Sequence, residues 1–237
     1  MFMHNGNIAC WRHVKREIAL SVGRKWFVGV QGNTDSEWAF ALFLDCLEKA
    51  GFDPDSEEFT VNGFGHTVLR KAMLQTIKLI NGFVDATPSE LRDEMMDKRS
   101  LLNFAVSDGH SVVCTKYVSS TTDEAASLYF SSGTSWKQGE GPGQYKMERR
   151  DKGADIVLVA SEPLTFERDN WVTVPTNSTI TIHKQTVMIH PIIDQYYNHS
   201  PSHTRSSGFA VSKGLVSNAP GATQAITPGN LRNAVAA

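Results

Sequence analysis

Apolar positions recur with a helical period in the first part of the chain. They predict helices over residues 9–21, 38–49 and 66–84, and Thr34 and Glu37 have the spacing of a capping box before the second of these. Residues 26–30 form a short apolar run between Gly-containing breaks, which predicts a strand. Residues 52–65 are rich in acids, glycine and proline and are expected to form a loop.

After residue 100 the pattern changes to that of β-strands. Two apolar runs flank Asp108-Gly109, which is a strong hairpin signal. Residues 86–99 are charged and expected to be exposed, and residues 139–143 are expected to form a loop. Helices followed by antiparallel strands indicate an α+β layered fold. The predicted strands are residues 101–107, 111–118, 127–131, 145–149, 155–160, 171–174, 179–183 and 186–190.

The end of the chain has a different composition from the rest. Beyond Tyr197 it is rich in Ser, Gly, Pro and Ala and has few large apolar residues. Such a segment buries too little apolar surface to offset the entropy lost on ordering. We therefore expect one folded domain over residues 1–197 and a low-complexity, disordered tail over residues 198–237.

Composition restricts the class of protein and its partners. The 237 residues are 41% hydrophobic and carry a net charge of −2, which supports a packed core and no basic field for nucleic acid. No apolar run reaches the roughly 20 residues that span a bilayer, so no membrane partner is expected. Three cysteines, an odd number, and an N-terminus without a signal-peptide pattern favour a cytoplasmic location.

Two short motifs contain residues suited to catalysis. In His4-Asn5-Gly6, the Asn side chain and the following N–H can form an oxyanion hole, although Asn-Gly is also a common turn. Asp35 can hold an ammonium group through a charge-assisted hydrogen bond. It can equally be an acid that stabilises the first turn of a helix. Taken one at a time, the motifs leave these alternatives open.

Other chemistry has weaker support. Cys46 lies near the apolar side of a predicted helix and Cys114 in a predicted strand, so both are expected to be buried rather than nucleophilic. His183 and His190 have no nearby acidic or Cys partner in the sequence, and no metal site is expected. Ser161 and Glu162 follow a predicted strand, where they either line a pocket or form a turn.

The two motifs together resemble the class II glutamine amidotransferase domain. The resemblance rests on His-Asn-Gly at residues 4–6, followed by a helix and by Thr-Asp-Ser-Glu at residues 34–37. Further blocks resemble the amidotransferase-type subunits of the fungal glutathione-degradation (Dug) complex, and together the blocks extend over most of residues 1–200. These blocks are residues 100–109, 122–128, 160–168 and 190–194.

This resemblance implies the fold and the roles of several residues. The fold would be a partial form of the four-layer αββα sandwich of N-terminal-nucleophile hydrolases. An N-terminal Cys would attack an amide carbonyl to form a thioester, without a cofactor or metal. Asn5 and Gly6 would form the oxyanion hole and Asp35 would bind the substrate's α-amino group. The remaining candidate pocket residues are His4, Thr34, Ser161 and Glu162.

The resemblance also implies partners and a pathway. The substrate would be a small γ-glutamyl compound, either glutamine or glutathione, because both contain the amide of a glutamate side chain. The reaction would serve glutathione catabolism. The protein partner would be a peptidase-like subunit.

The sequence departs from the family at its start. The family's Met-Cys start and its carboxylate-binding Arg precede the His-Asn-Gly motif, and neither is present before residue 4. Cys10 cannot replace the nucleophile because it lies after Asn5, at the start of a helix. Two explanations stay open: the chain is a fragment of a longer enzyme, or it is an inactive, shortened paralogue that serves as an interaction module for a peptidase-like partner. Either way we expect this chain alone to be inactive.

Overall fold

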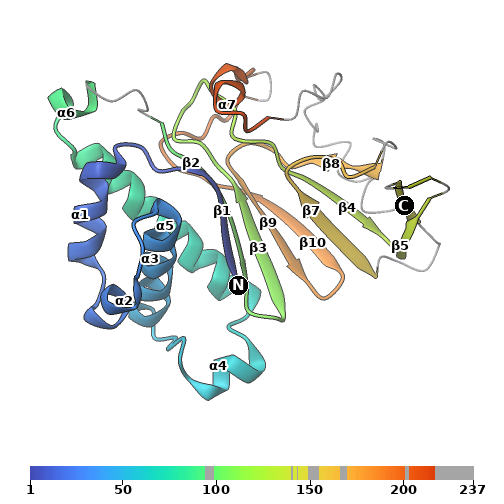
Figure 1. Ribbon diagram of the computed structural model, residues 1–237, viewed down its shortest axis with the longest axis horizontal. Coiled ribbons are helices and arrows are strands. Elements are labelled where there is room, and N and C mark those ends of the chain that lie inside the picture. The colour runs from blue at the N-terminus through green and yellow to red at the C-terminus, as the bar shows by residue number, and fades with distance from the viewer. Residues whose placement is uncertain are drawn as a thin grey trace.

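The protein forms helices and two main β-sheets arranged in layers (Figure 1). The computed structural model describes residues 1–93, 99–139, 141, 142, 144–148, 155–165, 170–200 and 203–216. A layer of helices covers one face of a five-stranded sheet, and a smaller sheet packs beyond its other face. The expected combination of helices and antiparallel strands in layers is confirmed.

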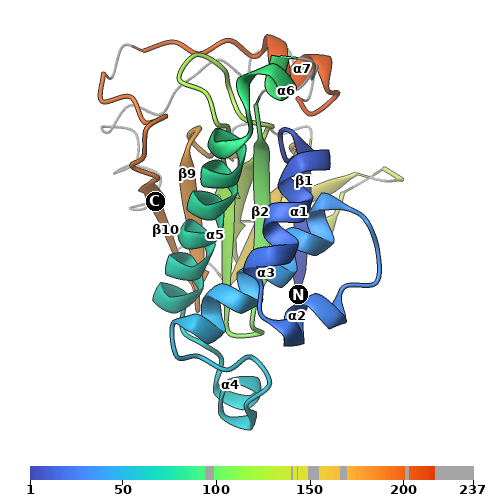
Figure 2. The same ribbon diagram turned by 90° about the vertical axis from the view of Figure 1, so that its left-hand side faces the viewer.

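Four helices form most of the helical layer (Figure 2). The predicted helices over residues 9–21, 38–49 and 66–84 are confirmed, within a few residues at each end. The short helix α4, Glu57–Asn62, interrupts the segment expected to be a loop, and α6, Ser89–Asp93, follows the layer. The helices of the layer are α1 Trp11–Ser21, α2 Arg24–Gly29, α3 Asp35–Lys49 and α5 His66–Ala86.

The strand predicted at residues 26–30 is wrong, because this run forms α2. A helical turn places the Trp26 indole N–H 2.7 Å from a Glu48 carboxylate oxygen on α3. The same turn places the Phe27 ring edge-on against Trp38. These contacts with α3 outweigh the β-propensity of a short aromatic and valine run, which is a weak local preference.

Five antiparallel strands form the larger sheet, in the order β1-β2-β3-β9-β10. The hairpin predicted around Asp108-Gly109 is confirmed as β2 and β3. The strand β1 lies at one edge and contains the first residues of the chain. The strands are β1 Phe2–Asn7, β2 Leu101–Ser107, β3 Ser111–Lys116, β9 Ser178–His183 and β10 Thr186–Pro191.

The smaller sheet has the order β7-β4-β8, and a further strand pair, β5 with β6, extends from it. A compact apolar cluster that includes Cys114, Phe130 and Ile180 fills the space between the two sheets. A larger cluster fills the space between the five-stranded sheet and the helices. The strands are β4 Tyr129–Gly133, β5 Ser135–Gln138, β6 Tyr145–Glu148, β7 Ile156–Ala160 and β8 Val172–Thr173, of which β5 was not predicted.

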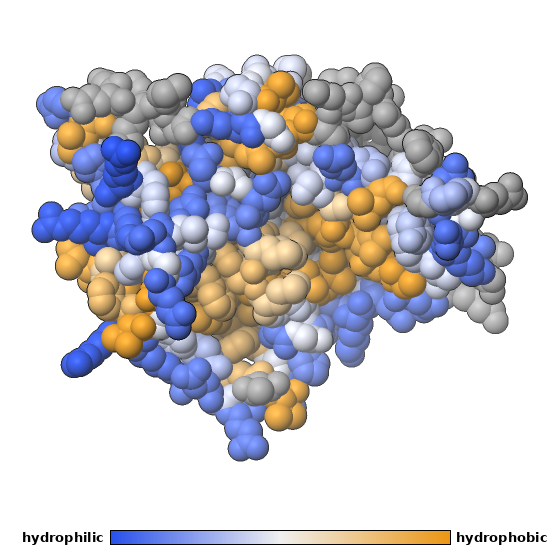
Figure 3. Space-filling model, in the orientation of Figure 1, coloured by the Kyte–Doolittle hydropathy of each residue, from blue (hydrophilic) through white to orange (hydrophobic). Residues whose placement is uncertain are grey.

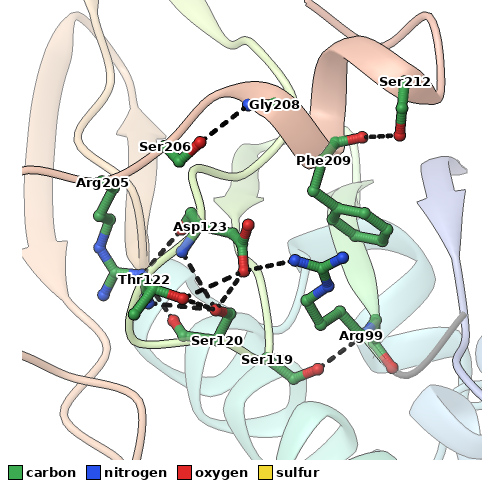
Figure 4. A network of polar contacts seen from close by, with 11 residues as sticks. Arg99, Ser119, Ser120, Thr122, Asp123, Arg205, Ser206, Gly208, Phe209 and Ser212 are labelled. Carbon is green, nitrogen blue, oxygen red and sulfur yellow. Dashed lines mark hydrogen bonds and ion pairs between the residues drawn. The ribbon is translucent and has the colours of Figure 1, made fainter.

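Residues 203–216 are folded against the body of the protein (Figure 4). The Arg205 guanidinium donates hydrogen bonds to the backbone carbonyls of Ser120, Asp123 and Tyr196. Phe209, on the short helix α7 Gly208–Ser212, is buried beneath the guanidinium of Arg99, which also pairs with Asp123 at 2.7 Å. The expectation of a disordered tail is therefore wrong for residues 203–216. Residues 201, 202 and 217–237 of that predicted tail lie outside the described part of the chain.

Candidate functional site

The predicted oxyanion motif lies on the edge strand β1. Side chains alternate between the two faces of a strand. The Phe2 ring stacks on Phe40 of α3, and the ring of His4 reaches Ser36 at the start of the same helix. Phe2 and His4 therefore face the helices, and Asn5 faces the side of the smaller sheet.

Gly6 is required by its close approach to β2. A Cβ atom at this position would lie 1.9 Å from the Leu101 carbonyl oxygen, and the backbone φ is +148°. No side chain fits there without moving the strand. The same Leu101 oxygen lies 3.1 Å from His4 Nε2, so the glycine also allows this carbonyl to approach the histidine.

His4 has a defined tautomer because its two ring nitrogens meet different partners. The Leu101 carbonyl can only accept a hydrogen bond, so Nε2 carries a proton. In the neutral ring Nδ1 then accepts from the Ser36 hydroxyl at 3.0 Å. Burial lowers the pKa of His4, against smaller raising effects of the Leu101 hydrogen bond and the Asp35 charge. The neutral ring, with Nε2 protonated, is the form that fits this site.

The lowered pKa of His4 predicts a dependence of stability on pH. The unfolded chain takes up a proton near pH 6.5 and the folded chain only at lower pH, so stability is complete above 6.5 and decreases below it. The decrease is at most about 1.4 kcal/mol per pH unit for one group. Urea unfolding of the wild type and His4→Gln between pH 7 and pH 5 measures it. The variant should lose part of the slope, whereas His199→Gln, at an exposed position, should keep it.

Asp35 lies beside the end of β1. One carboxylate oxygen accepts the backbone N–H of Ile8 at 2.9 Å, and the other accepts the N–H of Ser36 at 2.8 Å. A carboxylate has about four acceptor positions, so two such bonds leave room for a ligand ammonium. The sequence motifs at residues 4–6 and 34–37 are joined in space by the hydrogen bond between His4 and Ser36, and Asp35 is bonded to the backbone just beyond β1.

Thr34 caps helix α3, as the sequence indicates. Its hydroxyl oxygen accepts the Glu37 N–H at 3.3 Å, whereas the Glu37 carboxylate accepts the Gln31 N–H at 2.8 Å and does not complete the capping box. Thr34 is exposed. This cap explains why α3 starts here. Among the described residues, no contact joins Thr34 to Asn5 or Gly6.

Ser161 and Glu162 lie at the end of β7, in the smaller sheet. Both are exposed, and the Ser161 carbonyl accepts the Ser127 hydroxyl at 2.8 Å. No contact among the described residues joins either of them to His4 or Asp35. The backbone bends at both residues, and the two alternatives, a pocket lining and a turn, both stay predictions.

Two neighbours of the motif were not predicted. Ser36 contacts both His4 and Asp35, and its position next to Asp35 in the motif was an available signal. Asn103 lies directly opposite Asn5 on β2. Its side chain donates to the Ala126 carbonyl and accepts the Tyr117 N–H. A single Asn within an apolar strand was the signal for this position.

The cysteines of the sequence are poor nucleophiles where they stand. All three are buried. Burial raises the pKa of Cys114 to about 12, and burial also raises the pKa of Cys46. Only a thiolate attacks efficiently, so neither residue suits acyl transfer. Among the described residues no three His, Cys, Asp or Glu side chains lie together as metal ligands.

Comparison with known proteins reveals a clear relative. The chain is 50% identical over 219 residues to the probable glutamine amidotransferase DUG3 of Saccharomyces cerevisiae. The chain is a homologue of this probable glutamine amidotransferase. The alignment includes 92% of this chain and 59% of the yeast protein, so the chain spans about three fifths of its relative's length. The resemblance inferred from the motifs is confirmed.

The other comparisons add little. No protein-family model matches the chain. A solved structure of a glutamine aminotransferase class-II domain protein from Silicibacter pomeroyi covers 81% of this chain and 67% of its own, at 20% identity and a TM-score of 0.49. Because that score is below 0.5, this likeness carries no argument about the chain.

Proposed function

We propose that this chain supplies the substrate site of a γ-glutamyl amide hydrolase of the glutamine amidotransferase type, acting in glutathione catabolism. The observation that carries the proposal is the direct bond between the Asp35 carboxylate and the backbone at Ile8, two residues after Gly6. This bond holds Asp35, the proposed ammonium-binding group, at the end of β1, the strand that carries the proposed oxyanion donors. The 50% identity to a probable glutamine amidotransferase supports it.

In this proposal each residue has a limited task. Asp35 binds the α-ammonium of the γ-glutamyl group through its remaining acceptor positions. The Asn5 side-chain amide and the Gly6 N–H donate to the oxyanion that forms when the side-chain amide carbonyl is attacked. His4 and Ser36 position Asp35 and β1 from the helical side. We also propose that the helical layer and the two sheets correspond to three layers of a four-layer N-terminal-nucleophile sandwich.

The nucleophile is proposed to be an N-terminal cysteine outside this sequence. The raised pKa values of Cys46 and Cys114 support this part of the proposal. Among the described residues, no helix is both apolar enough and long enough to cross a membrane. A cytoplasmic location is also part of the proposal, on the grounds of cysteine usage and the N-terminal pattern.

Replacing Asp35 with Asn tests the substrate site in this chain as it stands. The substitution removes the charge that would hold the α-ammonium, and a hydrogen bond to a charged group contributes about 1.5–3 kcal/mol. Titration calorimetry with L-glutamine should show an affinity lower by roughly ten- to hundred-fold in the variant. Glu37→Gln, which removes a charge two residues further along α3, should bind as the wild type does. Equal affinity in the wild type and Asp35→Asn would contradict the proposal.

A peptidase-like partner is a second proposal, favoured by the surface. Apolar side chains gather across the middle of one face of the molecule (Figure 3). Met1, just before β1, and Met3, within β1, are exposed, and every residue of β7 is only partly buried. Exposed apolar surface of this kind is common where another protein segment packs. The catalytic proposal predicts glutamine binding, whereas a purely interacting paralogue needs none.

A further inference from the structure

Lys116 is a buried lysine without a close partner. It ends β3, its relative exposure is 5%, and no hydrogen bond or ion pair joins its side-chain ammonium to another described residue. Among the described residues, the Glu124 carboxylate is the charge that acts on Lys116, from beyond ion-pair distance, and it favours the charged lysine. Burial lowers the pKa of Lys116 to about 8. Such a charge is costly to keep inside a protein.

The side chain of Lys116 faces the space between the two sheets. Along β3, Val113 belongs to the apolar cluster beneath the helices, and Cys114 belongs to the cluster between the sheets. Strand alternation then places Lys116 on the same side as Cys114. Asn5, on β1, faces that side as well.

Asn5 and Lys116 lie in one row across the sheet. Asn5 pairs with Asn103. The β2–β3 register pairs Ala105 with Cys114 and continues to a bridge between Leu101 and Val118, so Asn103 falls opposite Lys116. Neighbouring strands are about 4.8 Å apart, which puts the backbones of Asn5 and Lys116 roughly 10 Å apart. The flexible lysine stem can shorten that gap for the charged end.

The spacing between Asn5 and Lys116 fits the leaving group of a γ-glutamyl substrate. Glutamine releases ammonia, which carries no carboxylate, whereas a γ-glutamyl peptide releases an amino acid or short peptide with a terminal carboxylate. An extended residue spans about 3.3–3.6 Å. One or two leaving residues together with the lysine side chain can therefore span the distance between Asn5 and Lys116. A buried ammonium is attracted to such a carboxylate more strongly than a solvated one.

We propose that Lys116 binds the terminal carboxylate of the leaving part of a γ-glutamyl dipeptide or tripeptide, and so favours such peptides over glutamine. This inference rests on the proposed function, because the γ-glutamyl group must first be held at Asp35 and Asn5. Lys116 is then a specificity-determining residue, and its unpartnered charge is kept for the ligand.

Titration calorimetry on the chain tests the inference with three ligands: L-glutamine, a γ-glutamyl dipeptide and the C-terminal amide of that dipeptide. The wild type should bind the free acid at least roughly tenfold more tightly than the amide, about 1.4 kcal/mol. Lys116→Met should lose this preference and keep its affinity for glutamine. Lys78→Met, an exposed position on α5, should behave as the wild type does.

An unchanged preference in Lys116→Met would overturn the inference and leave the proposed function standing. Absence of glutamine binding in the wild type would overturn both.

Thermal unfolding of the same variants gives a second readout. Without ligand, an uncompensated buried charge destabilises the fold, so Lys116→Met should melt at a higher temperature than the wild type. If Lys116 served only as the structural counter-ion of Glu124, removing it would lower the midpoint instead. A lower midpoint together with unchanged peptide preference would identify Lys116 as structural.

Discussion

Gly6→Ala is expected to lower the free energy of unfolding by about 4 kcal/mol, at the upper end of single substitutions. The new Cβ would lie 1.9 Å from the Leu101 carbonyl oxygen, a contact that only a shift of the backbone can relieve. The φ of +148° adds strain for any residue with a side chain. Urea unfolding followed by circular dichroism measures the loss.

A matched control is available in the same chain. Gly82 lies in helix α5, and a Cβ there would meet no heavy atom within 4 Å. Gly82→Ala should therefore stabilise the protein by about 0.5–1 kcal/mol, because alanine is the better helix former. If both substitutions changed stability by the same amount, the close approach of β1 to β2 would be wrong.

The consequence of Gly6→Ala should extend to His4. The Leu101 carbonyl that the methyl group would displace is also the acceptor for His4 Nε2. Without that acceptor, His4 no longer favours the tautomer protonated at Nε2. The NMR signals of the imidazole should then show both neutral tautomers. The glycine thus links backbone packing to the orientation of the groups around Asp35.

Helices and strands with strong periodicity were predictable from the sequence. Helix α5 and the β2–β3 hairpin follow directly from apolar spacing and from Asp108-Gly109. Helix α2 was not predictable, because its conformation depends on contacts of Trp26 and Phe27 with α3, far along the chain. The fold of residues 203–216 depends on Arg205 reaching three distant carbonyls, which no local pattern encodes.

In the candidate site, too, some residues could be predicted from local sequence and others depend on distant contacts. His4, Asn5, Gly6 and Asp35 could be predicted as site residues because their motifs are short and contiguous. Ser36, Asn103 and Lys116 gain their meaning only from strand register and helix packing. The sequence indicated which chemistry to expect, and only the arrangement of the sheets identifies the neighbours that tune it.

Asn5→Ala is expected to reduce the turnover number for glutamine hydrolysis by roughly 100- to 1000-fold, or about 2.7–4 kcal/mol, in a form that carries the proposed N-terminal cysteine. Such a form can be made by adding an upstream segment that begins with Cys to the N-terminus of this chain. Ammonia release measures the rate. The chain without that segment should release none.

Whether a substitution lowers the turnover number or the glutamine affinity is more informative than the size of the effect. An oxyanion donor acts mainly in the transition state, so Asn5→Ala should lower the turnover number and leave glutamine affinity nearly unchanged. Asp35→Asn should do the reverse and act mainly on affinity. Asn7→Ala, two residues along the same strand and on the same face, controls for a general disturbance of β1. If Asn5→Ala and Asn7→Ala lowered the rate equally, the side-chain amide of Asn5 would have no special role, and the oxyanion hole would have to be placed elsewhere.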